Sequence, residues 1–500
     1  MRSNWQGLIP AKAVHRCPFK SAKGVKFVIE AVSAHVDAKK DKFIALSDQI
    51  WDLAEIRFQE YRSSKAQMQA LEGEGFRITP NIGELPTAFV AEYGSGSPVI
   101  AILGEYDALA GLSQVAGATE MQPIDPTKEG HGCGHHLLGT AGVMAAVAVK
   151  DHLKENGACG TIRYYGCPAE EGGSGKTFMA RAGAFEEVDA ALCWHPSSFN
   201  GVNVSDTLAN LQVYFHFTGK ASHAAVSPHH GRSALDAVEL MNVGANYMRE
   251  HMPPTARVHY AITNTGGISP NVVQAEASVL YLVRSPDIQG VRCIFERVKK
   301  IAEGAALMTE TTVKCEIDRA TSSILPNTVL DRAVQQNLEA ARGPNFDASD
   351  FAFSERIRKT FSKEEIADSF LQLGLDVDPA KVMHTDVMPF SNQRQLDLGS
   401  TDVADVSRVV PTTQFWGACY AIGTAFHSWQ MVAQGKLPAA HKGMTYAAKV
   451  LAATALDLLN DRSLLEAAKA EYRSRMNGNP YECPIPAEVL PPVLRNGGRT

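Results

Sequence analysis

The chain lacks a strong excess of charge and any long hydrophobic run, and both absences narrow what it can be. Its 48 Lys and Arg residues nearly balance 54 Asp and Glu residues, so the formal net charge is only −6. We therefore do not expect a broad nucleic-acid face or an anionic-membrane face. The longest apolar run, near residues 137–149, is too short to span a bilayer and is followed by Lys150 and Asp151.

Cysteine is also sparse, and it follows no framework spacing. The nine cysteines are scattered through 500 residues, which favours a cytoplasmic protein with reduced thiols. The first twenty residues mix basic and polar side chains and contain no apolar stretch of the signal-peptide type. Residues 1–25 are interpreted as an irregular N-terminal arm.

The length predicts more than one structural unit, because single cores rarely grow beyond about 250–300 residues. Alternating helix and strand patterns in residues 1–207 predict an α/β sheet covered by helices on both faces. Residues 43–70 have helical periodicity, and residues 137–153 are apolar nearly all round, as in a buried helix. The expected strands of this sheet are residues 99–103, 161–165 and 190–194.

Residues 208–322 have a different order of elements. Expected strands at 211–217, 257–262, 277–283 and 312–317 alternate with expected helices at 233–250 and 290–306. This β-α-β-β-α-β order predicts a ferredoxin-like domain inserted into the first one. Residues 323–500 then return to the large domain. Within them, residues 340–395 are polar and irregular, and a helix at 436–459 ends the ordered part before a proline-containing tail.

The densest group of candidate metal ligands is the segment 131–136, with the sequence HGCGHH. Three histidines and one cysteine within six residues suit zinc or a similar divalent ion. The glycines allow sharp turns that let the ligands converge. The alternative is a histidine-rich surface loop.

Three further polar sites follow expected strands. Glu170 and Glu171 come after residues 161–165, His195 follows 190–194, and Asp107 follows 99–103. Taken alone, each has an ordinary interpretation as a solvated turn, a loop histidine or a helix cap. Ligands of open α/β sheets bind outside the carboxyl ends of the strands. Four polar sites at this one edge therefore predict a metal cluster.

Motifs spread over residues 104–430 resemble one family. The chain is similar to the M20 family of metallopeptidases and amidohydrolases, and most similar to its Cys-bridged branch that includes the p-aminobenzoyl-glutamate hydrolase-like amidohydrolases. The resemblance implies a zinc-peptidase-like α/β catalytic domain with an inserted lid and dimerisation domain. The matching stretches are GEYDALAGLSQ, GHGCGHHLLG, GCPAEEGGSGK, GKASHAA, GGISPNVV, YLVRSPD, GSTDVADVS and AFHSWQ.

The resemblance also implies roles for individual residues. Two divalent ions, Zn or Mn, would be bridged by the Cys133 thiolate. Glu170 would be the general base, and Asp107 would orient the metal ligands. The remaining implied metal ligands are His135, Glu171, His195 and His427.

Residues of the inserted domain are expected to hold the substrate. The resemblance implies that His223 reaches the active site of a partner subunit, which requires at least a homodimer. Asn271 and Arg284 resemble residues that bind the substrate's carboxylate, and an Arg fork suits this bidentate role. Without the resemblance, these three would be interpreted as a helix cap, a turn residue and a surface charge.

The expected reaction is metal-dependent hydrolysis of an N-acyl or N-aroyl amino acid with a free carboxylate. A p-aminobenzoyl-glutamate type substrate is favoured, and an indole-acetyl-amino-acid conjugate or a dipeptide is the alternative. Two other classes stay open: a thiol hydrolase that uses Cys133 as nucleophile, and a non-catalytic metal-binding subunit. The chain departs from relatives at His136, where they usually carry Asp. Residues 340–395 are a candidate part of the acyl pocket.

Overall fold

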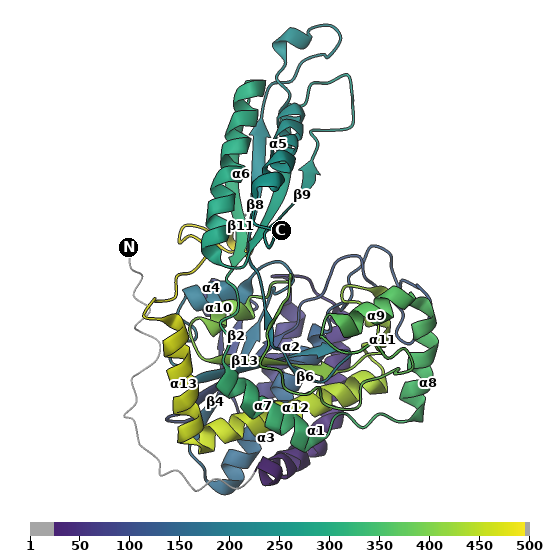
Figure 1. The fold of residues 1–500 in the computed structure, drawn as a ribbon, viewed down its shortest axis with the longest axis vertical. Coiled ribbons are helices and arrows are strands. Elements are labelled where there is room, and N and C mark those ends of the chain that lie inside the picture. The colour runs from purple at the N-terminus through teal and green to yellow at the C-terminus, as the bar shows by residue number, and fades with distance from the viewer. Residues whose placement is uncertain (1–24, 496–500) are drawn as a thin grey trace.

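The structure is a computed structural model that describes residues 25–495, so most of the expected N-terminal arm lies outside the described residues. Figure 1 shows a large body from which a smaller elongated unit projects. The large body is built on a seven-stranded mixed sheet, in which β4, β3, β5 and β13 run parallel. In spatial order its strands are β1 (Arg77–Pro80), β2 (Phe89–Ser95), β4 (Gly160–Cys167), β3 (Val99–Glu105), β5 (Ala190–Ser197), β13 (Thr412–Ala418) and β6 (Gly201–Val202).

Helices cover both faces of this sheet, as the alternating pattern predicted. Successive side chains of β3 point to opposite faces, so Ile100 and Ile102 enter one core while Ala101 and Leu103 enter the other. The first core is covered by α1 (Val25–Leu53), α2 (Tyr61–Gly73), α3 (His135–Asn156), α7 (Thr328–Ala341), α12 (Pro438–Asn460) and α13 (Arg462–Met476). The second is covered by the short helices α4 (Gly175–Arg181) and α10 (Val403–Ser407).

The projecting unit has the ferredoxin-like arrangement that the sequence predicted. Its four strands are all antiparallel in the order β11-β8-β10-β9, and two helices pack on the sheet. The elements are β8 (Ala209–Thr218), α5 (Ala234–Met248), β9 (Arg257–Asn264), β10 (Glu276–Ser285), α6 (Ile288–Thr309) and β11 (Thr312–Thr321). Strand β9 forms one edge of the sheet and is mostly exposed.

Three expectations about helices are wrong. Residues 43–70 are two helices, because the chain turns at 54–60, where Ala54 and Phe58 have positive φ angles. Residues 340–395 contain α8 (Ala348–Ile357) and α9 (Lys363–Leu371), each with a capping box at its start. The helix expected at 436–459 does not end the ordered part, because α13 follows it directly and α14 (Pro492–Arg495) comes later.

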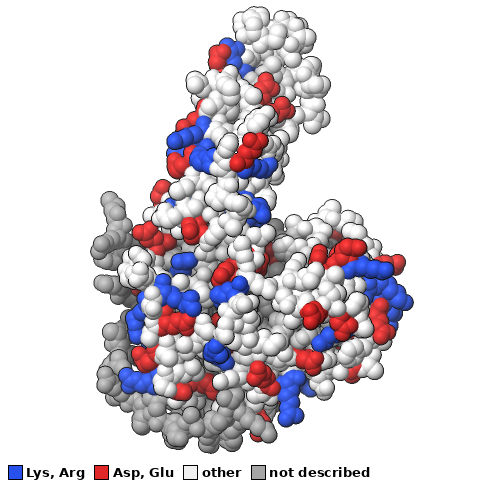
Figure 2. Space-filling model, viewed as in Figure 1, with Lys and Arg blue, Asp and Glu red and all other residues white. Residues whose placement is uncertain are grey.

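Three further short elements belong to the fold. They are α11 (Trp429–Gln434) and the parallel pair of β7 (Ser205–Asp206) with β12 (Gln395–Leu396). On the face drawn in Figure 2, basic and acidic side chains are interspersed over both parts of the molecule. None of the helices within residues 25–495 combines the length and apolarity that crossing a membrane requires.

Candidate active site

The sequence-predicted ligands gather at one edge of the large sheet. Asp107 and the Glu170–Glu171 pair come just after the carboxyl ends of β3 and β4, and His195 lies near the end of β5. His135 is the first residue of α3, and His427 comes from the loop after β13. Parallel strands end together at this edge, so residues far apart in the chain meet there.

Five of these side chains form two overlapping groups with Cys133 in both. Potential ligand atoms of Cys133, His135 and His195 all lie within 4.8 Å of one another. The same is true of Cys133, Glu171 and His427. A thiolate shared by two groups of this kind can bridge two metal ions, and the imidazole, carboxylate and thiolate donors suit zinc-like ions.

Distances between neighbouring donors fit ligands of a common ion. Cys133 Sγ lies 3.4 Å from His195 Nε2. His427 Nε2 lies 3.3 Å from Glu171 Oε1. Metal–ligand bonds of about 2.0–2.3 Å in tetrahedral geometry separate neighbouring donors by about 3.3–3.6 Å. The residues present therefore fit a pair of divalent ions.

Hydrogen bonds outside the donor groups fix their orientation. Asp107 is buried; its Oδ1 lies 2.8 Å from His135 Nδ1, and its Oδ2 accepts a hydrogen bond of 2.8 Å from the Glu171 backbone N–H. His195 Nδ1 donates to the Pro196 carbonyl over 2.9 Å. In both histidines the bonded Nδ1 leaves Nε2 to face the donor cluster, as in metal sites whose outer partners set the ring orientation.

The loops that carry the donors adopt uncommon backbone conformations. Gly134 has φ +77°, and a Cβ there would collide with the Tyr420 hydroxyl, so this position of the HGCGHH segment requires glycine. Ala169, just before the Glu pair, has φ 60°, and His427 has φ 59°. Such strained residues concentrate at functional sites because the surrounding structure must hold them in place. For Ala169, that support includes a 2.9 Å hydrogen bond from its N–H to Glu60.

Burial and neighbouring carboxylates disfavour the charged forms of two acidic groups at this site. Desolvation, and next the nearby Glu171, raise the pKa of the Cys133 thiol well above its ordinary value. Desolvation and the neighbouring carboxylates of Glu105 and Asp402 likewise raise the pKa of Glu170. A bound cation would reverse this balance, because it favours the charged forms of its ligands.

His195 and Glu171 differ in charge at neutral pH. Desolvation lowers the pKa of His195 to about 4, so its ring is neutral near pH 7 and Nε2 offers a lone pair. Desolvation also acts to raise the pKa of Glu171, but the hydrogen bond from His427 and the charge of His135 bring it to about 2. Glu171 is therefore a ready anionic donor.

His131 and His136 belong to the supporting structure. His131 Nε2 donates to the Ile50 carbonyl and His136 Nε2 to the Gly435 carbonyl, each over 3.0 Å. Both rings are fully buried, and desolvation lowers both pKa values. His136 thus places a neutral imidazole between α3 and the C-terminal part of the fold.

Arg284 is the one expected substrate-binding residue that lies near the large body. Arg284 lies at the base of the projecting unit, where Nη1 is 2.9 Å from Ser400 Oγ. His223 and Asn271 lie in adjoining loops beyond the other end of the sheet, joined by a hydrogen bond from Ala224 N to Asn271 O. The length of β10 separates these loops from Arg284 by roughly 27 Å.

Sequence reasoning missed three charged residues beside the site. Glu105 is fully buried and its Oε2 lies 3.2 Å from His135 Nε2, while Lys176 contacts its other oxygen. Arg319 lies near the end of β11. Burial lowers the pKa of its guanidinium, although the charge of Glu170 opposes this shift. Its Nε has no hydrogen-bond partner within residues 25–495. The sequence did contain a signal for Glu105: it is an acidic residue at the carboxyl end of an expected strand, two residues before Asp107.

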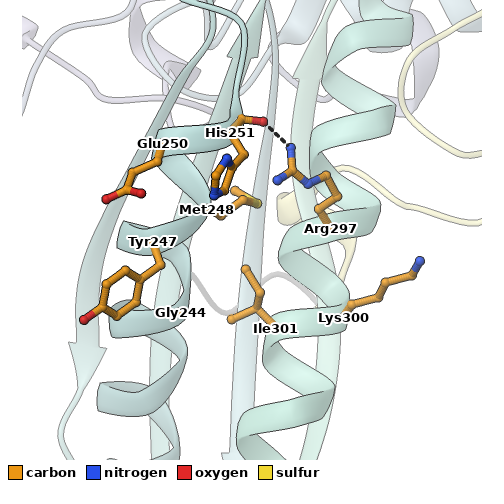
Figure 3. A pocket seen from close by; sticks show the side chains of 8 residues that line it. All are labelled: Gly244, Tyr247, Met248, Glu250, His251, Arg297, Lys300 and Ile301. Carbon is orange, nitrogen blue, oxygen red and sulfur yellow. Dashed lines mark hydrogen bonds between the residues drawn. The ribbon is translucent and has the colours of Figure 1, made fainter.

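A separate hollow of about 380 Å³ lies on the projecting unit, between α5 and α6 (Figure 3). Tyr247 and Met248 line it from one helix, and Arg297 and Ile301 from the other. Its lining includes none of the expected ligands or substrate-binding residues, so the chemistry is not expected there.

Comparison with known families identifies the chain. The model of peptidase family M20/M25/M40 matches residues 101–484. The chain belongs to this family. The matched span contains every donor of the two groups and both glutamates of the Glu170–Glu171 pair.

Relatives and solved structures agree with this assignment. The chain is 49% identical over 470 residues to one subunit of the p-aminobenzoyl-glutamate hydrolase of Escherichia coli, covering 92% of this chain and 98% of that protein. It is 29% identical to a mouse Xaa-Arg dipeptidase, over 91% of this chain and 94% of that protein. A Bacillus subtilis structure described as a dinuclear metal binding peptidase from the M20 family has a TM-score of 0.52 at 18% identity, covering 85% and 99% of the two chains.

The family and the fold together give the class of activity. This M20-type chain is a hydrolase of amide bonds that depends on metal ions. Its overall fold is similar to that of the Bacillus subtilis structure from the M20 family.

Proposed function

We propose that this enzyme hydrolyses the amide bond of an N-acyl or N-aroyl amino acid with a free carboxylate, with p-aminobenzoyl-glutamate as the leading substrate. The observation that carries the proposal is the place of Cys133 in both donor groups, beside Glu170. The 49% identity to a p-aminobenzoyl-glutamate hydrolase subunit supports the choice of substrate.

The proposed cofactor is a pair of divalent ions, Zn or Mn. Cys133 would bridge them, with His135 and His195 on one ion and Glu171 and His427 on the other. Ions held there would lower the pKa of a water molecule and polarise the amide carbonyl. The donor set does not choose between the two metals, because imidazole and carboxylate accept both.

Glu170 is the proposed general base. It neighbours the donors without belonging to the two Cys133 groups, and its raised pKa brings the carboxylate nearer to the working range of a base at neutral pH. Glu170 would take a proton from the attacking water and return it to the leaving amine. Asp107 would act through His135 and Glu171, which it holds in place.

Arginines at the base of the projecting unit would recognise the carboxylate of the substrate. Arg284 contributes a guanidinium there, and the charge of Arg319 acts on both Arg284 and Glu170. A guanidinium binds a carboxylate through two parallel hydrogen bonds. His223 and Asn271 would reach the site only from a second subunit, since their loops lie at the far end of the unit.

Two aromatic side chains favour an aryl acyl group. Trp416 and Phe426 flank His195, each with its ring centre 5.4 Å from the imidazole. Phe426 is 43% exposed although it stands next to the donor His427. Aromatic rings stack well on other rings, so these two residues would form one wall of the acyl pocket. Residues 340–395 would extend that wall, because Ile366 and Phe370 pack in the same cluster as Trp416.

The proposed assembly is a homodimer through the inserted domain, which we place at residues 208–322 between catalytic parts 1–207 and 323–500. The exposed edge strand β9 carries Tyr260 and Ile262, and α5 carries the exposed Val243 and Tyr247. An open edge strand of this kind is a site for pairing with another chain. A cytoplasmic location completes the proposal. Seven of the eight cysteines among the described residues are free thiols, and Cys159 is disulfide-bonded.

Light scattering tests the assembly. Ile262→Lys should give monomers, whereas Leu371→Lys, at an exposed leucine of the large body, should leave the dimer intact. An unchanged mass for Ile262→Lys would contradict pairing through β9.

The thiol-hydrolase alternative is disfavoured by the same geometry. Desolvation keeps the pKa of Cys133 high in the protein alone, whereas nucleophilic cysteines need a depressed pKa. A non-catalytic subunit has no need of Glu170 beside a complete donor set. We therefore retain the amidohydrolase as the single candidate.

The test of the proposal is a substrate panel assayed with the metal-loaded protein. It contains p-aminobenzoyl-glutamate, indole-acetyl-aspartate, an N-acetyl amino acid and a dipeptide with C-terminal arginine. The highest kcat/KM should fall on p-aminobenzoyl-glutamate, and capping its carboxylates as amides should lower that value. Equal rates on capped and free substrates would contradict carboxylate recognition, and turnover of none of the compounds would overturn the proposed substrate class.

A further inference from the structure

A buried charged network lies directly behind the candidate metal donors. Lys176, the second residue of α4, has no exposure to solvent. Its Nζ lies 2.6 Å from Glu105 Oε1 and 2.6 Å from Asp402 Oδ1. A charge buried this deeply is costly unless it is paired, so the three groups must be retained together or lost together.

Only one oxygen of Glu105 is held by Lys176. The other, Oε2, lies 3.2 Å from His135 Nε2, on the side of the ring that faces the donors. Ligand atoms of Glu105, His135 and Glu170 all lie within 4.8 Å of one another. His135 thus belongs to this group as well as to the group with Cys133 and His195.

The two nitrogens of His135 decide how Glu105 can interact. Nδ1 donates its hydrogen to Asp107, so Nε2 is the nitrogen that offers a lone pair to an ion once its own proton has left. When that lone pair binds an ion, Nε2 has no hydrogen to donate to Glu105. Oε2 then stands 3.2 Å from a metal-bound nitrogen, close to the spacing of about 3.3 Å between two oxygen or nitrogen donors of one tetrahedral ion.

We propose that Glu105 is a further oxygen donor to the ion that His135 holds, with Lys176 fixing its second oxygen so that it binds through one oxygen only. The inference rests on the proposed two-ion site. The proposal adds a carboxylate to an ion that would otherwise be held by Cys133, His135 and His195. It also assigns the buried Lys176 a role, which is to orient Glu105.

The test compares metal binding by three variants of the full-length protein. Glu105→Gln removes the anionic donor and one of the two partners of Lys176. The triple variant Glu105→Gln, Lys176→Met, Asp402→Asn removes the other two charges of the network as well. Asp405→Asn is the matched control, because Asp405 is an equally buried carboxylate that bonds Thr177 and Ser322 instead of this network. Zinc affinity is measured by competition with a chelator, and cobalt-loaded samples report coordination through their visible spectra.

Glu105→Gln should weaken one of the two ions by about 100-fold and change the cobalt spectrum, since even outer-shell partners of metal ligands contribute 10–100-fold. The triple variant should keep both defects, and the control should show neither. Should Glu105→Gln not fold, the triple variant carries the test, because it removes all three charges of the network and leaves none of them unpaired. Full recovery of affinity in the triple variant, or a wild-type cobalt spectrum in either Glu105 variant, overturns the inference. Wild-type protein that binds no ions would instead refute the proposed function on which it rests.

Discussion

Asp107 and His135 form a fully buried pair in which the carboxylate oxygen lies 2.8 Å from Nδ1 of the ring. The second oxygen of Asp107 accepts the backbone N–H of Glu171. One carboxylate thus connects the donor at the start of α3 with the donor after β4. The two candidate donor groups are therefore linked through Asp107 as well as through the shared Cys133.

Asp107→Asn should weaken metal binding by about 10–100-fold without unfolding the protein, because it loosens both attached donors. The measurement is zinc retained against a chelator. Asp48→Asn is the control, since Asp48 makes a similar 2.9 Å contact with His441 away from the site. Equal zinc retention by the two variants would contradict an orienting role for Asp107.

Glu170→Gln should keep both ions and lose about 100-fold or more of kcat, because proton transfer by a positioned base contributes roughly 10²–10⁴-fold. Glu171→Gln is the paired comparison, and it should lose metal as well as turnover, since Glu171 belongs to a donor group. Metal analysis and kcat on the same samples separate the two roles. Loss of metal from Glu170→Gln would show that Glu170 is a ligand.

Arg284→Ala should mainly raise KM for substrates with a free carboxylate, by about 10-fold or more, because it removes a charge-assisted pair. Arg257→Ala is a matched control: Arg257 pairs with Arg284 in register across β9 and β10 but bonds to the Pro254 and Ala256 carbonyls. The readout is KM for the free acid against the carboxamide. A similar KM ratio in wild type and Arg284→Ala would remove Arg284 from substrate binding.

Much of this site could be predicted from sequence because the donors follow strand ends. Buried apolar runs located β3, β4 and β5, and the edge that these strands share predicted that Asp107, Glu171 and His195 lie together. His427 was added only by the family resemblance. It lies far along the chain from the other donors, so sequence position alone does not predict that it contacts Glu171.

What sequence missed depends on contacts between distant segments. Lys176 resembles any lysine at a helix start, since its partner Asp402 is 226 residues away. The break between α1 and α2 was missed because its positive φ angles fall on Ala54 and Phe58, and neither residue type marks a turn in a sequence. The helices in residues 340–395 were missed although Asp347 and Ser362 start recognisable capping boxes, because polar composition concealed their weak apolar faces.

Asp331 should make stability depend on pH. Burial raises its pKa from 3.8 to about 7 despite a hydrogen bond from Thr413. The folded state therefore binds a proton that the unfolded state releases, so this group's contribution to stability falls as pH rises from about 4 to about 7 and is fully lost above that range. Asp331→Asn should keep the Thr413 bond and remove the dependence.

Urea unfolding at pH 5 and pH 8 measures this effect. The free energy of unfolding of Asp331→Asn relative to wild type should rise by on the order of 2 kcal/mol between the two pH values. Asp236→Asn, at an exposed first-turn position of α5, should show no such change. A constant difference between Asp331→Asn and wild type would mean that Asp331 is ionised throughout this range.

The most direct test of the account is hydrolysis of p-aminobenzoyl-glutamate by metal-stripped protein, titrated with Zn or Mn while bound metal is counted. We predict no turnover without metal and full recovery as occupancy approaches two ions per chain. Turnover that persists in metal-free protein would contradict the two-metal mechanism and identify Cys133 as the nucleophile to examine.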